Sequence, residues 1–186
     1  MTSLGVFLAI LFTIGWLPSY VFRVESLADA LPRYTPVERR TVRLAPLILA
    51  MHMTIACITL NLLPDIPLWA AAAGVLTFAA ALGIWSWGRV MIGPLRQRRL
   101  PDEPPLVFHR DGAFGIVRNP LYCGYLLATL APVIVARRGY LLITFGLVAL
   151  TLAVLALQEE RRLRAQLGPQ YDAYCRKVKR LLPFVW

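Results

Sequence analysis

Five apolar segments dominate this sequence, and their length limits what the chain can fold into more than any other property. A bilayer core of about 30 Å needs roughly 20 residues of apolar helix, because each helical residue rises about 1.5 Å. The segments that reach or approach this length are residues 2–22, 44–63, 66–87, 121–136 and 139–157. The sequence therefore predicts an all-α, polytopic membrane protein with five transmembrane helices.

The composition argues against the main competing classes of protein. Hydrophobic residues make up 58% of the chain, charged residues make up 16%, and the mean hydropathy is +0.61. These values exclude a soluble enzyme and a disordered chain. The formal net charge is +10, and beside so much apolar sequence this excess indicates loops against an anionic membrane face. We therefore expect membrane lipids as partners, and we expect neither nucleic acid nor an obligate protein partner.

Cysteine and histidine are few and lack the spacing of a metal site. Cys57, Cys123 and Cys175 lie far apart, with no pair of the CxxC type, so we expect free thiols. His52 lies within an apolar segment, where a hydrogen-bonded packing role is favoured over a metal or haem ligand. The sequence therefore predicts no metal centre.

The basic residues predict how the chain is oriented in the membrane. Of the 20 Lys and Arg residues, 18 fall in residues 23–43, 89–120 and 158–186, while Arg137 and Arg138 alone fall on the other side. Cytoplasmic loops carry the excess of Lys and Arg. We therefore expect a cell-membrane protein with its N-terminus outside and its C-terminus in the cytoplasm. With only two residues between them, the last two segments should form a tight helical hairpin.

We expect a single domain over residues 1–186, with two parts. Residues 1–88 form a three-helix membrane part, and residues 89–186 hold a loop, the helical hairpin and a tail. Four prolines in residues 89–105 predict a shaped loop instead of one continuous helix, and this loop could act as a lid. The fifth helix should project into the cytosol, stop at Gly168 and Pro169, and resume over residues 170–180.

Two short stretches contain the residues that could carry chemistry. Arg118, Asn119 and Pro120 mark a helix start at the membrane boundary, where unpaired N–H groups favour an anionic ligand. The alternative is that Arg118 simply reaches toward phospholipid phosphates. Glu159 and Glu160 lie where a helix C-terminus disfavours negative charge, so something must compensate them.

The compensating group for the two carboxylates is left open by the sequence. A cationic ligand would compensate them, and so would pairing with Arg161, Arg162 and Arg164 along a solvated helix face. Arg89, just past the third segment, could attract an anionic acceptor, or it could be an ordinary interfacial cation.

Taken together, the two stretches resemble the isoprenylcysteine carboxyl methyltransferase and phospholipid methyltransferase superfamily. The resemblance extends over residues 109–183, with the helical hairpin between its two halves. At the positions of the family pattern this sequence has Gly112, Phe114, Arg118, Asn119, Pro120, Tyr122, Gly124, Glu159, Glu160, Leu163, Gly168, Tyr171, Tyr174 and Pro183. Phe114 stands where the family usually has Tyr, and Asn119 stands where the carboxyl methyltransferases commonly have His.

The resemblance implies an integral-membrane enzyme that transfers a methyl group from S-adenosylmethionine to a lipophilic acceptor at the cytoplasmic face. The cofactor-binding residues it implies are Leu106, Val107, Phe108, His109, Phe114, Arg118, Asn119, Tyr122 and Glu159. Arg89 and Glu160 are the candidate catalytic residues. Arg89 would hold a carboxylate acceptor, and a Glu could accept a proton if the acceptor is an amine. Glu160 is alternatively a supporting contact. Methyl transfer needs mainly proximity, alignment and a dry site, and no metal.

For both the methyl acceptor and the reaction class, the sequence leaves alternatives open. A carboxylate of isoprenylcysteine type is the first expectation, and a phospholipid amine is the second. A nicotinamide-dependent membrane reductase and a non-catalytic membrane adaptor remain as rival functions.

Overall fold

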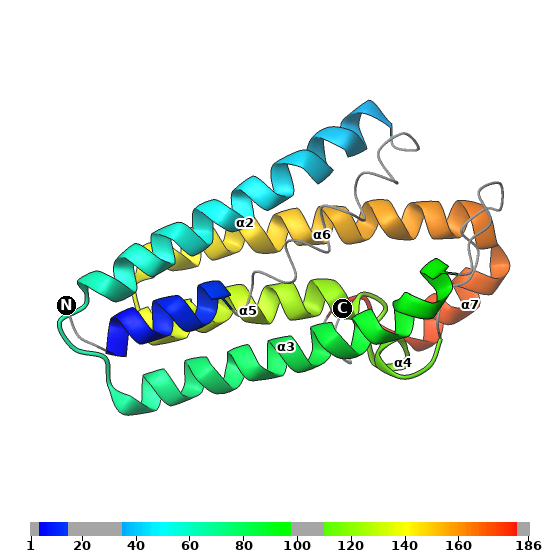
Figure 1. Ribbon diagram of the computed structural model, residues 1–186. Helices are drawn as coiled ribbons and strands as arrows, with labels where there is room; N and C mark the ends of the chain where they lie inside the picture. Colours follow the sequence, from blue (N-terminus) through cyan, green and yellow to red (C-terminus); the bar gives the residue numbers. More distant parts are fainter. Residues whose placement is uncertain (1–3, 15–34, 98–109, 182–186) are drawn as a thin grey trace. The chain divides into compact units, whose positions relative to one another are not determined.

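The computed structural model of the chain describes residues 4–14, 35–97 and 110–181, and these residues are almost entirely helical (Figure 1). The helices are Leu4–Ile14, α2 (Pro36–Leu62), α3 (Leu68–Gln97), α4 (Ala113–Ile116), α5 (Pro120–Ala136), α6 (Gly139–Leu167) and α7 (Pro169–Lys177). Within the described residues, extended pairing is limited to one isolated parallel bridge between Val117 and Lys179. The prediction of an all-α fold is confirmed.

Three of these helices are long and apolar enough to cross a bilayer. They are α2, α3 over Leu68–Ile92, and α6. The apolar helices Leu4–Ile14 and α5 are shorter, and the 17 residues of α5 extend only about 26 Å. Residues 2, 3 and 15–22 of the first predicted span lie outside the described residues. The fold is therefore that of a helical membrane protein with three helices of spanning length, and the count of five spans stays a prediction.

Helix α2 begins earlier than the apolar segment that predicted it. Thr35 and Glu38 form a capping box: Glu38 N–H donates to Thr35 Oγ1 at 3.3 Å, and Thr35 N–H donates to Glu38 Oε2 at 2.9 Å. Pro36 occupies the first helical position, which suits its fixed φ. The apolar segment 44–63 lies within this helix but does not include its polar first turns, which hydrophobicity alone does not detect.

Helix α3 continues beyond its predicted end at residue 87, as far as Gln97. The expectation that the proline-rich loop begins at residue 89 was therefore wrong for residues 89–97. Pro94 lies within this helix, as Pro46 lies within α2 and Pro132 within α5. One proline removes a single helical hydrogen bond, which a long helix can tolerate. Residues 98–105 of the suggested lid lie outside the described residues.

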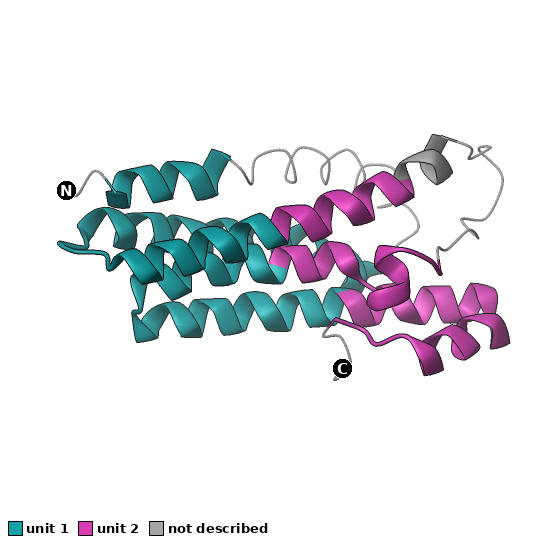
Figure 2. Cartoon of the chain, turned by 90° about the horizontal axis from the view of Figure 1, so that it is seen from below, with its two compact units in different colours: residues 1–80, 126–155 teal, residues 81–125, 156–186 magenta. Residues whose placement is uncertain are grey.

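The chain forms two compact units, whose boundary falls within α3, α5 and α6 (Figure 2). Unit 1 consists of residues 1–80 and 126–155. In its core the rings of Phe12 and Phe78 lie 5.0 Å apart. His52 is fully buried; its Nδ1 lies 2.8 Å from Thr144 Oγ1 and its Nε2 lies 2.9 Å from the Thr129 carbonyl oxygen. The expected hydrogen-bonded packing role of His52 is confirmed.

The connection between α5 and α6 consists of Arg137 and Arg138 alone, which confirms the predicted tight hairpin. Arg137 has a φ of 51°, in the left-handed region. Its guanidinium lies over the ring of Trp69, 5.5 Å from the ring centroid. This cation–π contact accounts for the position of the Arg137 side chain.

Unit 2 consists of residues 81–125 and 156–186. Gly124 allows α5 to approach α3 closely, because a Cβ at this position would lie 2.8 Å from Trp85 Cβ. Gly168, with a φ of 52°, ends α6 and precedes α7, as predicted. However, α7 ends at Lys177 and not at residue 180, because the following residues pair with the segment before α5.

Candidate functional site

Every candidate residue that the structure describes lies in unit 2. Helix α3 contributes Arg89, α4 contributes Phe114, α5 contributes Tyr122, and α6 contributes Glu159 and Glu160. Arg118 and Asn119 precede α5. Leu106, Val107, Phe108 and His109 lie outside the described residues.

The segment before α5 is held by the residues that follow α7. The backbone N–H of Arg118 donates to the Lys179 carbonyl at 2.7 Å, and that of Asn119 donates to the Arg180 carbonyl at 3.1 Å. The Asn119 side-chain amide donates to the same Arg180 carbonyl at 3.3 Å. Residues 178–181, which we call the 178–181 segment, therefore fix the start of α5.

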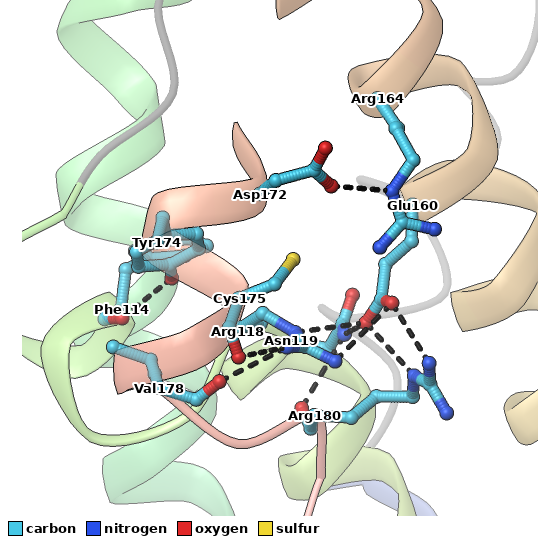
Figure 3. A network of polar contacts seen from close by, with 10 residues as sticks. All are labelled: Phe114, Arg118, Asn119, Glu160, Arg164, Asp172, Tyr174, Cys175, Val178 and Arg180. Carbon is cyan, nitrogen blue, oxygen red and sulfur yellow. Dashed lines mark hydrogen bonds and ion pairs between the residues drawn. The ribbon is translucent and has the colours of Figure 1, made fainter. Parts of the chain in front are cut away.

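Glu160 is the centre of a buried charged network (Figure 3). Its side chain is only 3% exposed, yet its two oxygens accept hydrogen bonds from three residues. Arg118 donates from Nε at 3.1 Å and from Nη2 at 3.3 Å, and Asn119 donates from Nδ2 at 3.2 Å. Arg180 donates from Nε at 2.9 Å and from Nη2 at 3.0 Å. We call Arg118, Asn119, Glu160 and Arg180 the Glu160 cluster.

The charges of the Glu160 cluster explain why a carboxylate can be buried there. An isolated buried carboxylate carries a desolvation penalty of several kcal/mol, which close guanidinium partners offset. Both arginines contact Glu160 through two nitrogens, the geometry that gives the strongest carboxylate pairing. Two guanidinium groups and one carboxylate leave the cluster with a formal charge of +1.

Arg118 is committed to protein acceptors on all sides of its guanidinium. Besides Glu160, its Nη1 donates to the carbonyl oxygens of Cys175 at 2.9 Å and Val178 at 3.0 Å. The Arg118 side chain is 9% exposed. The alternative in which Arg118 reaches toward phospholipid phosphates is therefore wrong, because its donors already have partners inside the protein.

Glu159 and Glu160 have opposite environments although they are neighbours in sequence. Successive residues of an α-helix point about 100° apart, so Glu159 is exposed where Glu160 is buried. Glu160 pairs with Arg118 and Arg180, while Arg164 pairs with Asp172 at 2.7 Å. The alternative in which the arginines of α6 compensate the carboxylate is therefore wrong for Glu160.

The hydrogen bonds that Glu160 already accepts also affect whether it could serve as a proton acceptor in catalysis. Both of its oxygens already accept charge-assisted hydrogen bonds, so it is poorly placed to take a proton from a reacting group. These contacts fit the alternative in which Glu160 is a supporting contact, since it connects α6 to the residues that precede α5.

Tyr174 connects α7 to α4, and Tyr171 packs beside it. The rings of Tyr171 and Tyr174 lie 5.8 Å apart, and both side chains are buried. The Tyr174 hydroxyl donates to the Phe114 carbonyl oxygen at 2.6 Å. Burial raises the pKa of both tyrosine hydroxyls above the ordinary value of 10.0. Both hydroxyls are therefore neutral, and the hydrogen bond of Tyr174 holds α4 to α7.

Arg180 is the important residue that sequence reasoning missed. It belongs to a basic stretch with Arg176, Lys177 and Lys179, and these three are exposed while Arg180 is partly buried. The only available signal was the match of this region to the basic tail of the family pattern, which does not distinguish one basic residue from the next. Among the residues that the structure describes, no group of three or more potential metal ligands is present.

These features define a helical membrane protein with a buried, positively charged polar cluster at the start of α5. No family model, curated protein or solved structure matches this chain. The residues of unit 2 and their chemistry are therefore the basis for inferring a function.

Proposed function

We propose that the protein is an integral-membrane methyltransferase that transfers a methyl group from S-adenosylmethionine to a lipophilic acceptor at the cytoplasmic face. One observation carries this proposal. The two stretches that resemble the methyltransferase superfamily come together, because Arg118 and Asn119 contact Glu160 across sequence separations of 42 and 41 residues. The chain needs this juxtaposition if both stretches are to contribute to one cofactor pocket.

The residues around the Glu160 cluster fit the cofactor by their chemistry. Glu159 presents an exposed carboxylate beside the cluster, which suits the ammonium group of the cofactor. Phe114 and Tyr122 are partly exposed aromatic side chains in the same unit. When bound, S-adenosylmethionine would supply an activated methyl group on a sulfonium. The protein would then have to align the acceptor in line with that methyl and exclude water.

The acceptor we favour is a carboxylate of isoprenylcysteine type. Arg89 is partly buried in α3 of the same unit, and its guanidinium would hold an anionic acceptor. A carboxylate is already a nucleophile at neutral pH, so this reaction needs no base. The second candidate is a phospholipid amine, which must first lose a proton, and Glu159 would then be the carboxylate that accepts it.

The first experiment is calorimetric binding of S-adenosylmethionine and S-adenosylhomocysteine to the purified protein in nanodiscs, with a nicotinamide dinucleotide as control. We expect saturable binding of the first two only. Glu159→Gln should weaken binding about tenfold, which corresponds to about 1.4 kcal/mol. Asp172→Asn is the matched control, because it neutralises another exposed carboxylate of unit 2 that pairs with Arg164.

Each of the other results would overturn the proposal in favour of a named rival. Binding of the nicotinamide dinucleotide alone would indicate a membrane reductase. Binding of none of the three in nanodiscs would indicate a membrane adaptor without catalytic activity.

The acceptor is tested with S-adenosylmethionine labelled in its methyl group. The purified enzyme is offered a farnesylated cysteine derivative or vesicles that contain phosphatidylethanolamine. A methyl ester releases labelled methanol in alkali, whereas an N-methyl group does not, so the label reports the methylated atom. We expect base-labile product, and Arg89→Gln should raise KM for the carboxylate substrate more than it lowers kcat.

A further inference from the structure

Unit 1 contains a cavity of about 270 Å³ that the proposed methyl transfer does not use. It is lined by Thr59, Leu62, Leu63, Arg138 and Tyr140. These residues come from the end of α2, the α5–α6 turn and the start of α6. Because α2 and α6 are both long enough to span a bilayer, a cavity where one ends and the other begins lies at a membrane boundary.

The hydrogen bonds around the cavity decide which ligand it can take. Thr59 Oγ1 donates to the Ile55 carbonyl at 2.8 Å and lies 2.7 Å from the Tyr140 hydroxyl. Since the single hydroxyl proton of Thr59 is used, Tyr140 must be the donor in the second bond. Tyr140 then presents only lone pairs to the cavity. Among the lining side chains, Arg138 is therefore the one that can donate hydrogen bonds to an anion.

The two arginines of the turn have different surroundings. The Arg137 guanidinium lies over the Trp69 ring, as described above. Within residues 4–14, 35–97 and 110–181, Arg138 forms no ion pair and no side-chain hydrogen bond. In particular, it does not pair with Asp65 in the connection between α2 and α3. Arg138 is thus an exposed cation at a membrane boundary whose compensating charge is not supplied by the described protein.

We propose that this cavity binds the headgroup of an anionic phospholipid, with the phosphate on Arg138 and an acyl chain along the exposed side of Leu62. The lining combines one cation with two apolar side chains, and Leu62 is 76% exposed, which matches a ligand with an anionic head and an apolar tail. The volume lies below the roughly 300–1,000 Å³ of pockets that enclose drug-sized ligands, so only the headgroup would enter. This inference does not depend on the proposed methyl transfer.

The test is native mass spectrometry of the full, detergent-purified chain mixed with equal amounts of phosphatidylglycerol and phosphatidylcholine that share the same acyl chains. We expect one tightly held phosphatidylglycerol molecule, enriched several-fold over phosphatidylcholine. Arg138→Gln should abolish the enrichment of that molecule, and Arg138→Lys should keep part of it because the charge remains. Lipids attracted to the basic segments elsewhere are unaffected by this change and are counted as background.

One matched variant and one competitor make the result decisive. Arg137→Gln removes a charge from the same turn, outside the cavity lining, and should keep the enrichment. An enrichment that survives in Arg138→Gln, or its absence from the natural chain, would overturn the proposal. Displacement of the bound lipid by inorganic phosphate alone would also overturn it, by assigning the cavity to a free anion.

Discussion

Arg180 and Glu160 form a bidentate ion pair, with Nε 2.9 Å from Oε1 and Nη2 3.0 Å from Oε2. The same two carboxylate oxygens accept hydrogen bonds from Arg118. Glu160 therefore lies between two guanidinium groups, one from the segment before α5 and one from the 178–181 segment. The stability of unit 2 should depend on this arrangement more than on any exposed charge.

Arg180→Gln should loosen the 178–181 segment. The change removes two charge-assisted hydrogen bonds to a buried carboxylate, and we expect a loss of about 2 kcal/mol in local stability. Hydrogen–deuterium exchange of residues 169–181 measures it. The exchange of Arg180→Lys should lie between that of the natural chain and that of Arg180→Gln, because lysine keeps the charge but not the bidentate geometry. Arg176→Gln, at an exposed position, is the control; equal exchange in all variants would contradict the prediction.

Glu160→Gln should be far more damaging than Glu159→Gln. Loss of the buried carboxylate leaves Arg118 and Arg180 facing each other without a counter-charge, which costs about 3–5 kcal/mol in comparable buried pairs. Glu159 is exposed, so its replacement should leave stability nearly unchanged. The measurement is the fraction of monodisperse protein in size-exclusion chromatography after mild heating. Similar losses of monodisperse protein for the two variants would mean that the buried ion pairs of Glu160 contribute little to stability.

Alkaline pH should destabilise α7 through its two buried tyrosines. Burial raises the pKa of Tyr171 and Tyr174 above 10.0, so folding favours their neutral forms. Their contribution to stability is complete below about pH 10 and is lost as the pH rises further. Ultraviolet titration should show a late step of tyrosine ionisation, above about pH 10, that coincides with unfolding. The double variant Tyr171→Phe with Tyr174→Phe should lack this late step; a single common step in the natural chain would refute the prediction.

Gly124→Ala should destabilise the contact between α5 and α3. The added Cβ would lie 2.8 Å from Trp85 Cβ and 3.0 Å from the Ala81 carbonyl oxygen, so one helix must shift. Overpacking of this kind costs about 1–3 kcal/mol. Gly83→Ala is the matched control, since a Cβ there has no neighbour within 4 Å. In thermal unfolding in detergent, we expect Gly124→Ala to have a Tm several degrees below that of Gly83→Ala.

Much of the helical framework could be predicted from apolar segment length alone. The hairpin at Arg137 and Arg138 and the stop at Gly168 follow from where apolar sequence is interrupted and where glycine and proline stand together. The start of α2 and the end of α3 could not be predicted in this way. Capping by Thr35 and Glu38 adds a polar helical turn that hydrophobicity does not detect, and Pro94 does not end α3.

The composition of the Glu160 cluster was only partly predictable. The family resemblance grouped Arg118, Asn119 and Glu160, and the structure brings these three together. The sequence could not decide which of the two adjacent glutamates faces inward, because α6 is apolar around most of its circumference and offers no polar face to orient it. Nor could it select Arg180 from its basic neighbours, since this choice depends on the pairing of Val117 with Lys179.

The two partners of Glu160 enter the growing polypeptide at different times. Arg118 precedes it by 42 residues, while Arg180 follows it by 20. During synthesis from the N-terminus, the carboxylate can meet its first guanidinium as soon as the hairpin has formed, but it must wait for the second. The start of α5 is therefore locked late, after the helices of the hairpin are already made. Any ligand that requires the finished arrangement can bind only once that last step of maturation is complete.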